Sequence, residues 1–356
     1  MAQEPAEVTV DIQPERRVDI IDVSKRIEEQ APGFLSEFPR TTYTSYHTTA
    51  GYFEQVFAKR LGHDRQTLQA YVGSFQGLFP EGADYRHDQM DLRDELSDEQ
   101  KLVEPRNADS HLTFIGSGLE NTVTYHNEPD TPVYFVDLDG VYEENRRNRR
   151  TTALGYNRDE IVDQFTLEIP VSKHPIDSIN LWDPQLGLFD RLHELIRIHG
   201  IDRGRIDLAL DPCEKNTGLT VNEYETLLMR HDLREVLQDP IRFMAQRGRN
   251  MLRDPKAIKE KAKDYAKYDL VHFVNRFIDR AGLSESFIER VIDKFVQVPA
   301  QRFLRMKRGV SLVVEGSEAE KPSRIIAGTY QSPILVQWRR AETGARRVNV
   351  TYTRYV

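Results

Sequence analysis

The sequence is poor in three features that would assign the chain to a class of protein. It contains one cysteine, Cys213, in 356 residues, which excludes an internal disulfide framework and fits a reducing compartment. It has no apolar run near the roughly 18 residues of a membrane-spanning helix, and its start, MAQEPAEVTV, does not match a signal peptide. We therefore expect a cytoplasmic protein that does not enter a membrane, with Cys213 as an inert thiol.

An excess of positive charge is also missing. The chain carries 57 Asp and Glu residues against 49 Lys and Arg residues, which gives a formal net charge of −8. No global field therefore draws it to nucleic acid or to an anionic membrane, and we expect neither as a partner. Two basic runs, Arg146 to Arg150 and Arg339 to Arg347, are interpreted as solvated strand or turn positions, with contacts to an anion as the alternative.

What the sequence does contain is a repeated plan, and its length suits two domains of ordinary size. In each copy a helical stretch, Val23 to Gln30 or Asp190 to Gly200, leads through a glycine turn into an alternating strand that ends in polar residues. We therefore predict two tandem domains, residues 1–158 and residues 159–356. Within the second, residues 240–308 have helical spacing and are predicted to form a helical insertion.

The expected elements define an α+β fold with mainly antiparallel sheets and helices on one side. The first copy has predicted strands at Glu7 to Ile12, Arg17 to Ile21, Thr41 to Tyr46, Leu112 to Phe114, Thr122 to His126 and Val133 to Leu138, and a second helix pair at Gly51 to Leu61 and Arg65 to Phe75. The second has predicted strands at Ser311 to Glu315, Ile325 to Thr329, Ile334 to Trp338 and Arg347 to Tyr352, the last two as a hairpin through Gly344. The acidic segment Asp88 to Glu104 is predicted to be a mobile surface loop.

Short polar motifs recur in a definite order along both copies. The first copy holds His47-Thr48-Thr49-Ala50, Tyr85-Arg86-His87 and Asn107-Ala108-Asp109-Ser110-His111-Leu112. The second holds Thr220-Val221-Asn222-Glu223, Arg230-His231-Asp232 and Gly328-Thr329-Tyr330-Gln331-Ser332. Together these motifs resemble the YjbQ family, whose members are described as secondary thiamine-phosphate synthases, although this chain divides the family's motifs between its two copies.

The resemblance implies an activity and an assembly. The activity would join an aminopyrimidine diphosphate to a thiazole phosphate with release of pyrophosphate, so a small phosphorylated molecule is the expected partner. The assembly would be a homo-oligomer, with a trimer as the leading arrangement. The residues implied for substrate binding are Thr48, Thr49, Arg86, Asn107, Asn222, Thr329 and Gln331.

His47, His87 and His111 are the most informative polar residues. Three neutral imidazoles from separate strand ends can hold a divalent ion, Mg²⁺ or Zn²⁺, with one coordination position open. Partly protonated, they can instead bind phosphate, and each histidine taken alone can be an ordinary surface or core residue. Asp109 would lie on the same face as His111 if that segment is extended, and it could then orient an imidazole.

The polar residues of the second copy allow structural interpretations as well. Asn222 can cap a helix that opens with Glu223, which would explain both residues without a role in the reaction. Arg230 and Asp232 can form an ion pair on the helix surface. Gln331, within a predicted strand, can face solvent or a neighbouring strand.

The two copies have kept different motifs, and this favours one composite site. We predict that His47, His87, His111, Asp109 and Glu223 form its catalytic set, with the histidines of the first copy facing Asn222, Glu223, Thr329 or Gln331 of the second. The segment Asp88 to Glu104 would be a flap beside it. An alternative is a binding or scaffold protein that has kept the fold and lost the chemistry.

A further alternative comes from residues 133–141, which resemble the opening motif of haloacid-dehalogenase-type phosphatases. In that motif the first carboxylate, here Asp137, is the nucleophile and the second, Asp139, the general acid and base. That fold needs the motif on its first strand, whereas here it stands 137 residues into the chain and aligns with a strand of the second copy. We therefore prefer the transferase.

Overall fold

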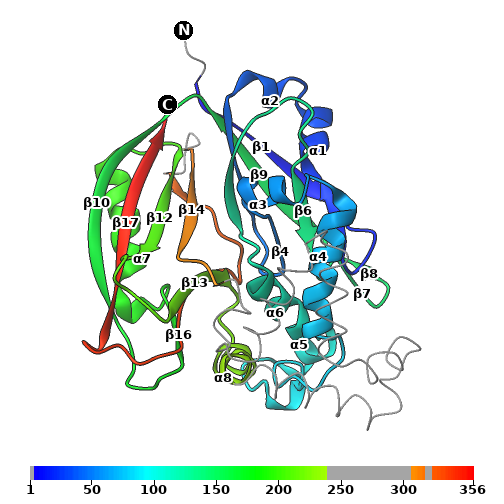
Figure 1. The fold of residues 1–356 in the computed structure, drawn as a ribbon, viewed down its shortest axis with the longest axis vertical. Coiled ribbons are helices and arrows are strands. Elements are labelled where there is room, and N and C mark those ends of the chain that lie inside the picture. The colour runs from blue at the N-terminus through cyan, green and yellow to red at the C-terminus, as the bar shows by residue number, and fades with distance from the viewer. Residues whose placement is uncertain (1–3, 239–305, 317–322) are drawn as a thin grey trace, which may run out of the picture. The chain divides into compact units, whose positions relative to one another are not determined.

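The computed structural model describes residues 4–238, 306–316 and 323–356 (Figure 1). All but the last three residues of the predicted insertion 240–308 lie outside these ranges. The chain divides into two compact units. Unit 1 comprises Met1–His63, Gly118–Tyr224 and Met306–Val356, and unit 2 comprises Asp64–Ser117 and Glu225–Arg305. Each unit therefore draws on both predicted domains, and the boundary after residue 158, between two strands, stays a prediction.

Unit 1 is an α+β structure in which the strands of both halves form antiparallel sheets. Its first half contains β1 (Ala6–Ile12), β2 (Asp19–Asp22), α1 (Val23–Gln30), α2 (Phe34–Glu37), β3 (Arg40–Ser45), β4 (Ala50–Gly51), α3 (Gln55–Arg60), β5 (Thr122–His126), β6 (Tyr134–Asp137), β7 (Val141–Tyr142), β8 (Asn145–Arg146) and β9 (Arg149–Tyr156). Its second half contains β10 (Asp159–Pro170), β11 (Asp177–Asn180), η2 (Pro184–Leu186), α7 (Leu188–Ile198), β12 (Gly204–Leu210), β13 (Thr217–Asn222), β14 (Gly309–Glu315), β15 (Arg324–Ile325), β16 (Ser332–Gln337) and β17 (Ala345–Tyr355).

The two halves of unit 1 have the same strand order. The first half forms sheets β1-β9-β3-β5 and β2-β6-β4, and the second forms β10-β17-β12-β14-β15 and β11-β16-β13. Taken in chain order, the strands of these sheets in one half match those of the other, with β15 as an addition in the second half and the separate pair β7-β8 as an addition in the first. Since β16 and β17 lie in different sheets, the predicted hairpin through Gly344 is wrong; Gly344, at a φ of 74°, turns the chain from one sheet to the next.

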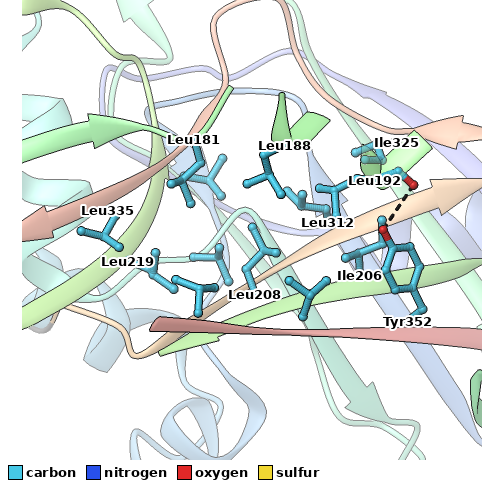
Figure 2. Close-up of a cluster of buried hydrophobic side chains, with 14 of the residues drawn as sticks. Leu181, Leu188, Leu192, Ile206, Leu208, Leu219, Leu312, Ile325, Leu335 and Tyr352 are labelled. Carbon is cyan, nitrogen blue, oxygen red and sulfur yellow. Dashed lines mark hydrogen bonds between the residues drawn. The ribbon is translucent and has the colours of Figure 1, made fainter. Parts of the chain in front are cut away.

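Each half buries one face of its large sheet under a helix. In the first half, Asp22 caps α1 by accepting a hydrogen bond from the backbone N–H of Lys25, and Val23 and Ile27 point into the core. In the second half, the apolar stripe of α7 packs on the five-stranded sheet. Figure 2 shows this core, including Leu188 and Leu192 of α7 and the bond from the Tyr352 hydroxyl to the Leu192 carbonyl at 3.2 Å.

The opposite faces of the two large sheets meet inside unit 1. Tyr156 of β9 and Tyr355 of β17 stack with ring centroids 3.9 Å apart, and Val313 and Ile326 pack around them. The Tyr355 hydroxyl also shares a 2.8 Å hydrogen bond with Thr42 of β3. The halves are thus joined by a buried contact between sheets.

A buried arginine fixes the same corner of each half. Arg149, at the start of β9, donates to the Asp137 carboxylate at 2.7 and 3.0 Å. Arg346, near the start of β17, donates to the Gln337 amide oxygen at 3.3 Å and to the Glu214 carboxylate at 2.9 Å. Both arginines belong to the basic runs, so the interpretation of those runs as solvated is wrong for these two positions, which are 7% and 5% exposed.

Unit 2 is built from the segments that follow equivalent strands, β4 in the first half and β13 in the second. Its described elements are α4 (Arg65–Leu78), η1 (Met90–Leu92), α5 (Asp98–Val103), α6 (Ala108–Ser117), the π-helix η3 (Leu228–Asp232) and α8 (Leu233–Gln238). Helices α4 and α6 pack against each other, as Figure 1 shows. None of the helices described in either unit is long and apolar enough to cross a membrane.

Three element predictions within residues 51–117 are wrong. Leu112 to Phe114, predicted as a strand, lies in α6, whose ten residues are all buried. The predicted helix Gly51 to Leu61 is shorter, because Gly51 belongs to β4 and α3 begins at Gln55. The segment Asp88 to Glu104 is not structureless, since it holds η1 and α5, and Ser97 and Gln100 form a capping box at the start of α5.

Candidate functional site

His87 and His111 lie together inside unit 2. Each is 1% exposed, their ring centroids are 5.4 Å apart, and a ligand nitrogen of one lies within 4.8 Å of a ligand nitrogen of the other. His111 projects from α6, and His87 lies in the segment that joins α4 to η1. Two buried imidazoles at this spacing are suitable donors for a divalent transition-metal ion.

Asp88 connects the two histidines. Its Oδ1 lies 3.0 Å from His87 Nδ1 and accepts a hydrogen bond from the Ala108 N–H, the first of α6, at 3.1 Å. A carboxylate can only accept, so this contact puts the His87 proton on Nδ1 and leaves the lone pair on Nε2. The same carboxylate holds the start of the helix that carries His111. This is the arrangement by which proteins orient a metal-binding imidazole.

Asp232 fixes the backbone of His87 from the other segment of unit 2. Its carboxylate is fully buried and accepts hydrogen bonds from the N–H groups of Arg86 at 3.1 Å and His87 at 3.0 Å. The Arg86 guanidinium lies 3.0 Å from His231 Nδ1; partial burial, and then Arg86, lower the pKa of His231. The Arg230-His231-Asp232 motif thus meets the Tyr85-Arg86-His87 motif, and Asp232 is not the exposed half of a surface ion pair.

Arg93 packs the acidic segment against the site. It is 2% exposed, its guanidinium donates to the His87 carbonyl at 3.4 Å, and it lies 3.9 Å from both Glu104 and Glu225. It also pairs with Glu95. A buried cation with three carboxylate neighbours anchors this segment at Arg93. The predicted mobility of the segment stays a prediction.

Asp109 and Asn107 are placed by α6. Asp109 is buried in the first turn, two residues before His111. The segment is a helix, in which two residues span about 200°, so the extended backbone that would place both side chains on one face is not present. Asn107 lies just before the helix, is buried, and its carbonyl accepts the Ser110 N–H at 2.9 Å.

His47 lies in unit 1, so the structure assigns the three histidines to different units. Its Nε2 accepts a hydrogen bond from the Arg150 N–H at 2.8 Å, which makes that nitrogen unavailable to a metal. Burial, followed by Arg149, Arg147 and Arg150, lowers the pKa of His47 to about 3. His47 is therefore a neutral acceptor that holds the turn beside it.

Two amide side chains of the second half, Gln331 and Asn222, bind the backbone on either side of His47. Gln331 donates to the carbonyls of Ser45 at 2.8 Å and His47 at 3.0 Å, and Asn222 donates to the Thr48 carbonyl at 3.1 Å. A Cβ on Gly328 would lie 1.8 Å from the Tyr46 carbonyl oxygen, so only glycine permits this approach. The motifs of the two halves do meet, but the amides bind backbone carbonyls.

The remaining predicted residues have simpler surroundings. Thr49 accepts from Arg149 at 3.3 Å, and Thr329 is exposed on the turn before β16, where Gln331 also lies, outside a strand. Asn222 ends β13 and is not a helix cap. Glu225 takes that role, because its carboxylate accepts the N–H groups of Leu227 and Leu228 at 2.7 and 2.6 Å.

Glu223 is a half-buried residue of unit 1, two positions before unit 2 begins at Glu225. Its N–H donates to the Asn222 side chain at 2.9 Å. Its carboxylate has the chemistry of a metal ligand, and its role in the site stays a prediction.

The phosphatase alternative does not fit the surroundings of Asp137. Strand β6 is the centre of an antiparallel three-stranded sheet, and the Asp137 carboxylate is completely buried against Arg149. Burial outweighs the effect of Arg149 and raises the pKa of Asp137. Asp139 pairs with Arg147 at 3.0 Å. These carboxylates form a structural network in place of a nucleophile and its acid.

Asp88 and Arg93 are two residues that the sequence did not indicate. Both stand in an acidic stretch that looked solvated. The position of Asp88 directly after His87 was the available clue, since adjacent carboxylates often orient histidine ligands.

Comparison with known proteins gives matches among solved structures. A YbjQ-like protein of unknown function from Sulfolobus solfataricus P2 is 11% identical, with a TM-score of 0.28, and the match covers 55% of this chain and 99% of that one. A protein of the YjbQ family from Clostridium acetobutylicum is 12% identical over 55% of this chain and 100% of its own, with a TM-score of 0.25. A hypothetical protein from Aeropyrum pernix K1 is 14% identical over 54% and 98%, with a TM-score of 0.27. No protein-family model and no curated protein matches the chain.

Proposed function

We propose that the chain binds a divalent transition-metal ion through His87 and His111, with Glu223 as a third ligand, and that this site acts on a small phosphorylated molecule. The observation that supports the proposal is the pair of buried imidazoles within 4.8 Å of each other. The Asp88 carboxylate on His87 Nδ1 supports it as well, because a histidine that binds a metal almost always donates its other ring N–H to a carboxylate, a backbone carbonyl or water.

Glu223 is the proposed third ligand for two reasons. It offers a carboxylate oxygen, and two imidazoles with one carboxylate are a common donor set of catalytic metal sites, which keep a position open for substrate. Glu223 also stands two residues before Glu225, where the second segment of unit 2 begins. That segment contains Asp232, whose carboxylate accepts the N–H of His87. Two imidazoles favour Zn²⁺ or a similar ion over Mg²⁺, which prefers oxygen ligands.

For the reaction, we propose the transfer that the sequence motifs imply. The bond between the methylene carbon of the aminopyrimidine and its diphosphate oxygen breaks, pyrophosphate leaves with the electron pair, and the thiazole nitrogen forms the new bond to that carbon. A bound divalent cation would neutralise the charge that develops on the leaving diphosphate. The exposed guanidinium of Arg86, held next to the site by His231, is suited to bind a phosphate oxygen.

The first experiment measures metal binding by the full-length chain. We expect the purified protein to contain metal by elemental analysis, and to bind Zn²⁺ in calorimetric titration after chelation. The variants His87→Ala and His111→Ala should each lose this binding, and Glu223→Gln should weaken it. His126→Ala, which removes an exposed imidazole at the end of β5, should bind like the wild type. A wild type that binds no metal would refute the proposal.

A second experiment separates catalysis from binding. The metal-loaded protein is incubated with the aminopyrimidine diphosphate and the thiazole phosphate, and pyrophosphate is measured. Release that the wild type supports and His111→Ala does not would support the transferase. Metal binding without release would leave the alternative of a binding or scaffold protein.

A further inference from the structure

The segment between the two buried histidines, residues 88–106, is attached to the rest of unit 2 at few points. It contains η1 and α5, all of its residues are described, and Arg93 is the only one of them that is buried. No described helix or strand packs extensively against η1 or α5. A segment with so few buried contacts can open locally while the remainder of the domain stays folded.

Both ends of this segment are fixed beside the candidate metal site. It starts directly after His87, and its first residue, Asp88, accepts a hydrogen bond from the N–H of Ala108, just beyond its end, at 3.1 Å. Asp88 also lies 3.0 Å from His87 Nδ1. The part between the two ends can therefore swing away while the ends, and the histidines next to them, keep their places.

Arg93 holds the middle of the segment against its surroundings. Its guanidinium donates to the His87 carbonyl at 3.4 Å and lies 3.9 Å from Glu225, and both of these groups are outside the segment. Its other two carboxylate neighbours, Glu95 and Glu104, belong to the segment itself. On opening, the first two contacts break and the last two can move with Arg93. The guanidinium thus keeps a charge partner in both states, which limits the cost of opening.

The histidine pair is closed off from solvent in this arrangement, since His87 and His111 are each 1% exposed. A substrate that is to reach a metal ion between them needs part of unit 2 to move, as in enzymes whose lids open for binding and release. We propose that residues 88–106 are a lid over the histidine pair and that Arg93 is the latch that keeps it closed. The purpose of the lid rests on the metal site proposed above, but its opening can be measured without metal.

The test is labelling of the metal-free, full-length chain with diethylpyrocarbonate, which modifies accessible neutral imidazoles, with the rate at each histidine read by peptide mass spectrometry. In the wild type, His87 and His111 should be labelled much more slowly than the exposed His126. Arg93→Met should speed the labelling of His87 and His111 about 10- to 100-fold, the factor that corresponds to the loss of a hydrogen bond to a charged group. The rate at His126 should not change.

The matched control is Arg106→Met, which removes an exposed arginine of the same segment and should be labelled like the wild type. Glu225→Gln removes the charge of the partner outside the segment and keeps the shape of its side chain, so it should speed labelling by a smaller factor. This second variant decides the question if Arg93→Met does not fold.

Hydrogen exchange separates opening of the lid from unfolding of the whole unit. The amides of α4, which lies outside the segment, should keep their wild-type protection in Arg93→Met and Glu225→Gln. Loss of that protection together with faster labelling, or unchanged labelling in the variants that fold, would overturn the proposal. A wild type that binds no metal would refute the metal site alone, because the labelling result does not depend on metal.

Discussion

The Arg149–Asp137 pair gives the sharpest prediction for stability. The substitution Arg149→Met keeps the aliphatic length of the side chain and leaves the Asp137 carboxylate, which is 0% exposed, without its cation. Removal of one partner of a buried, doubly hydrogen-bonded pair costs about 3–5 kcal/mol. With a urea dependence of about 2–3 kcal/mol per molar, the unfolding midpoint should fall by about 1 to 2.5 M.

The assay is urea unfolding followed by tryptophan fluorescence. Both tryptophans of the chain, Trp182 and Trp338, lie in unit 1, so their fluorescence reports on the unit that contains the pair. The matched control is Arg150→Met at the next position. Arg150 is exposed and pairs with the exposed Asp11 at 3.2 Å, so its loss should cost less than about 1 kcal/mol.

The pH dependence adds a second readout. Burial already raises the pKa of Asp137, and Arg149 is the main influence that opposes the rise. Without Arg149, the folded pKa rises further above the unfolded value, so the folded variant gains stability at low pH and loses it as pH increases. The loss caused by Arg149→Met should therefore be smaller at pH 5 than at pH 8. A loss as small as that of the Arg150 control, or one equal at both pH values, would refute this account.

Three further predictions concern other sites. Asp88→Asn should weaken Zn²⁺ binding about 10- to 100-fold in calorimetry without unfolding the chain; unchanged affinity would exclude an orienting role for this carboxylate. Burial raises the pKa of Glu120 to about 7, so stability should decline as pH rises from about 4.5 to 7, and Glu120→Gln should remove this part of the decline in urea unfolding; identical pH profiles would contradict it. Gly328→Ala forces a Cβ against the Tyr46 carbonyl and should cost about 3 kcal/mol or more, whereas Gly73→Ala, which has open space, should be tolerated; equal melting temperatures would show that the turn can move.

Local elements were predictable where the apolar pattern was clear. The helix Val23–Gln30 has the predicted bounds, because Asp22 caps it and only Val23 and Ile27 are buried. The segment Leu112 to Phe114 was assigned to a strand because α6 is buried on all sides. A helix without a polar face does not show the alternation of apolar and polar residues at helical spacing by which a helix is predicted.

The two buried histidines of the candidate site were predictable from the sequence, but their contacts were less so. The motifs indicated His87 and His111, yet the backbone of His87 is held by Asp232, 145 residues away in sequence. Neither Asp88 nor Arg93 could be separated from the solvated acidic residues around them, because burial depends on how the segment folds. Such long-range contacts have no local pattern.

The buried arginines of the two halves differ in where their acidic partner stands. Arg149 pairs with Asp137, which lies at a strand end. At the equivalent strand end Arg346 binds the amide of Gln337, and its carboxylate partner is Glu214, which lies in a turn. A single exchange therefore has a different effect in each half: Gln337→Asp would give Arg346 a second carboxylate beside Glu214, whereas Asp137→Gln would leave Arg149 with none. A chain that loses Asp137 before it gains a carboxylate elsewhere near Arg149 would have a buried guanidinium without a charge partner and would be less stable.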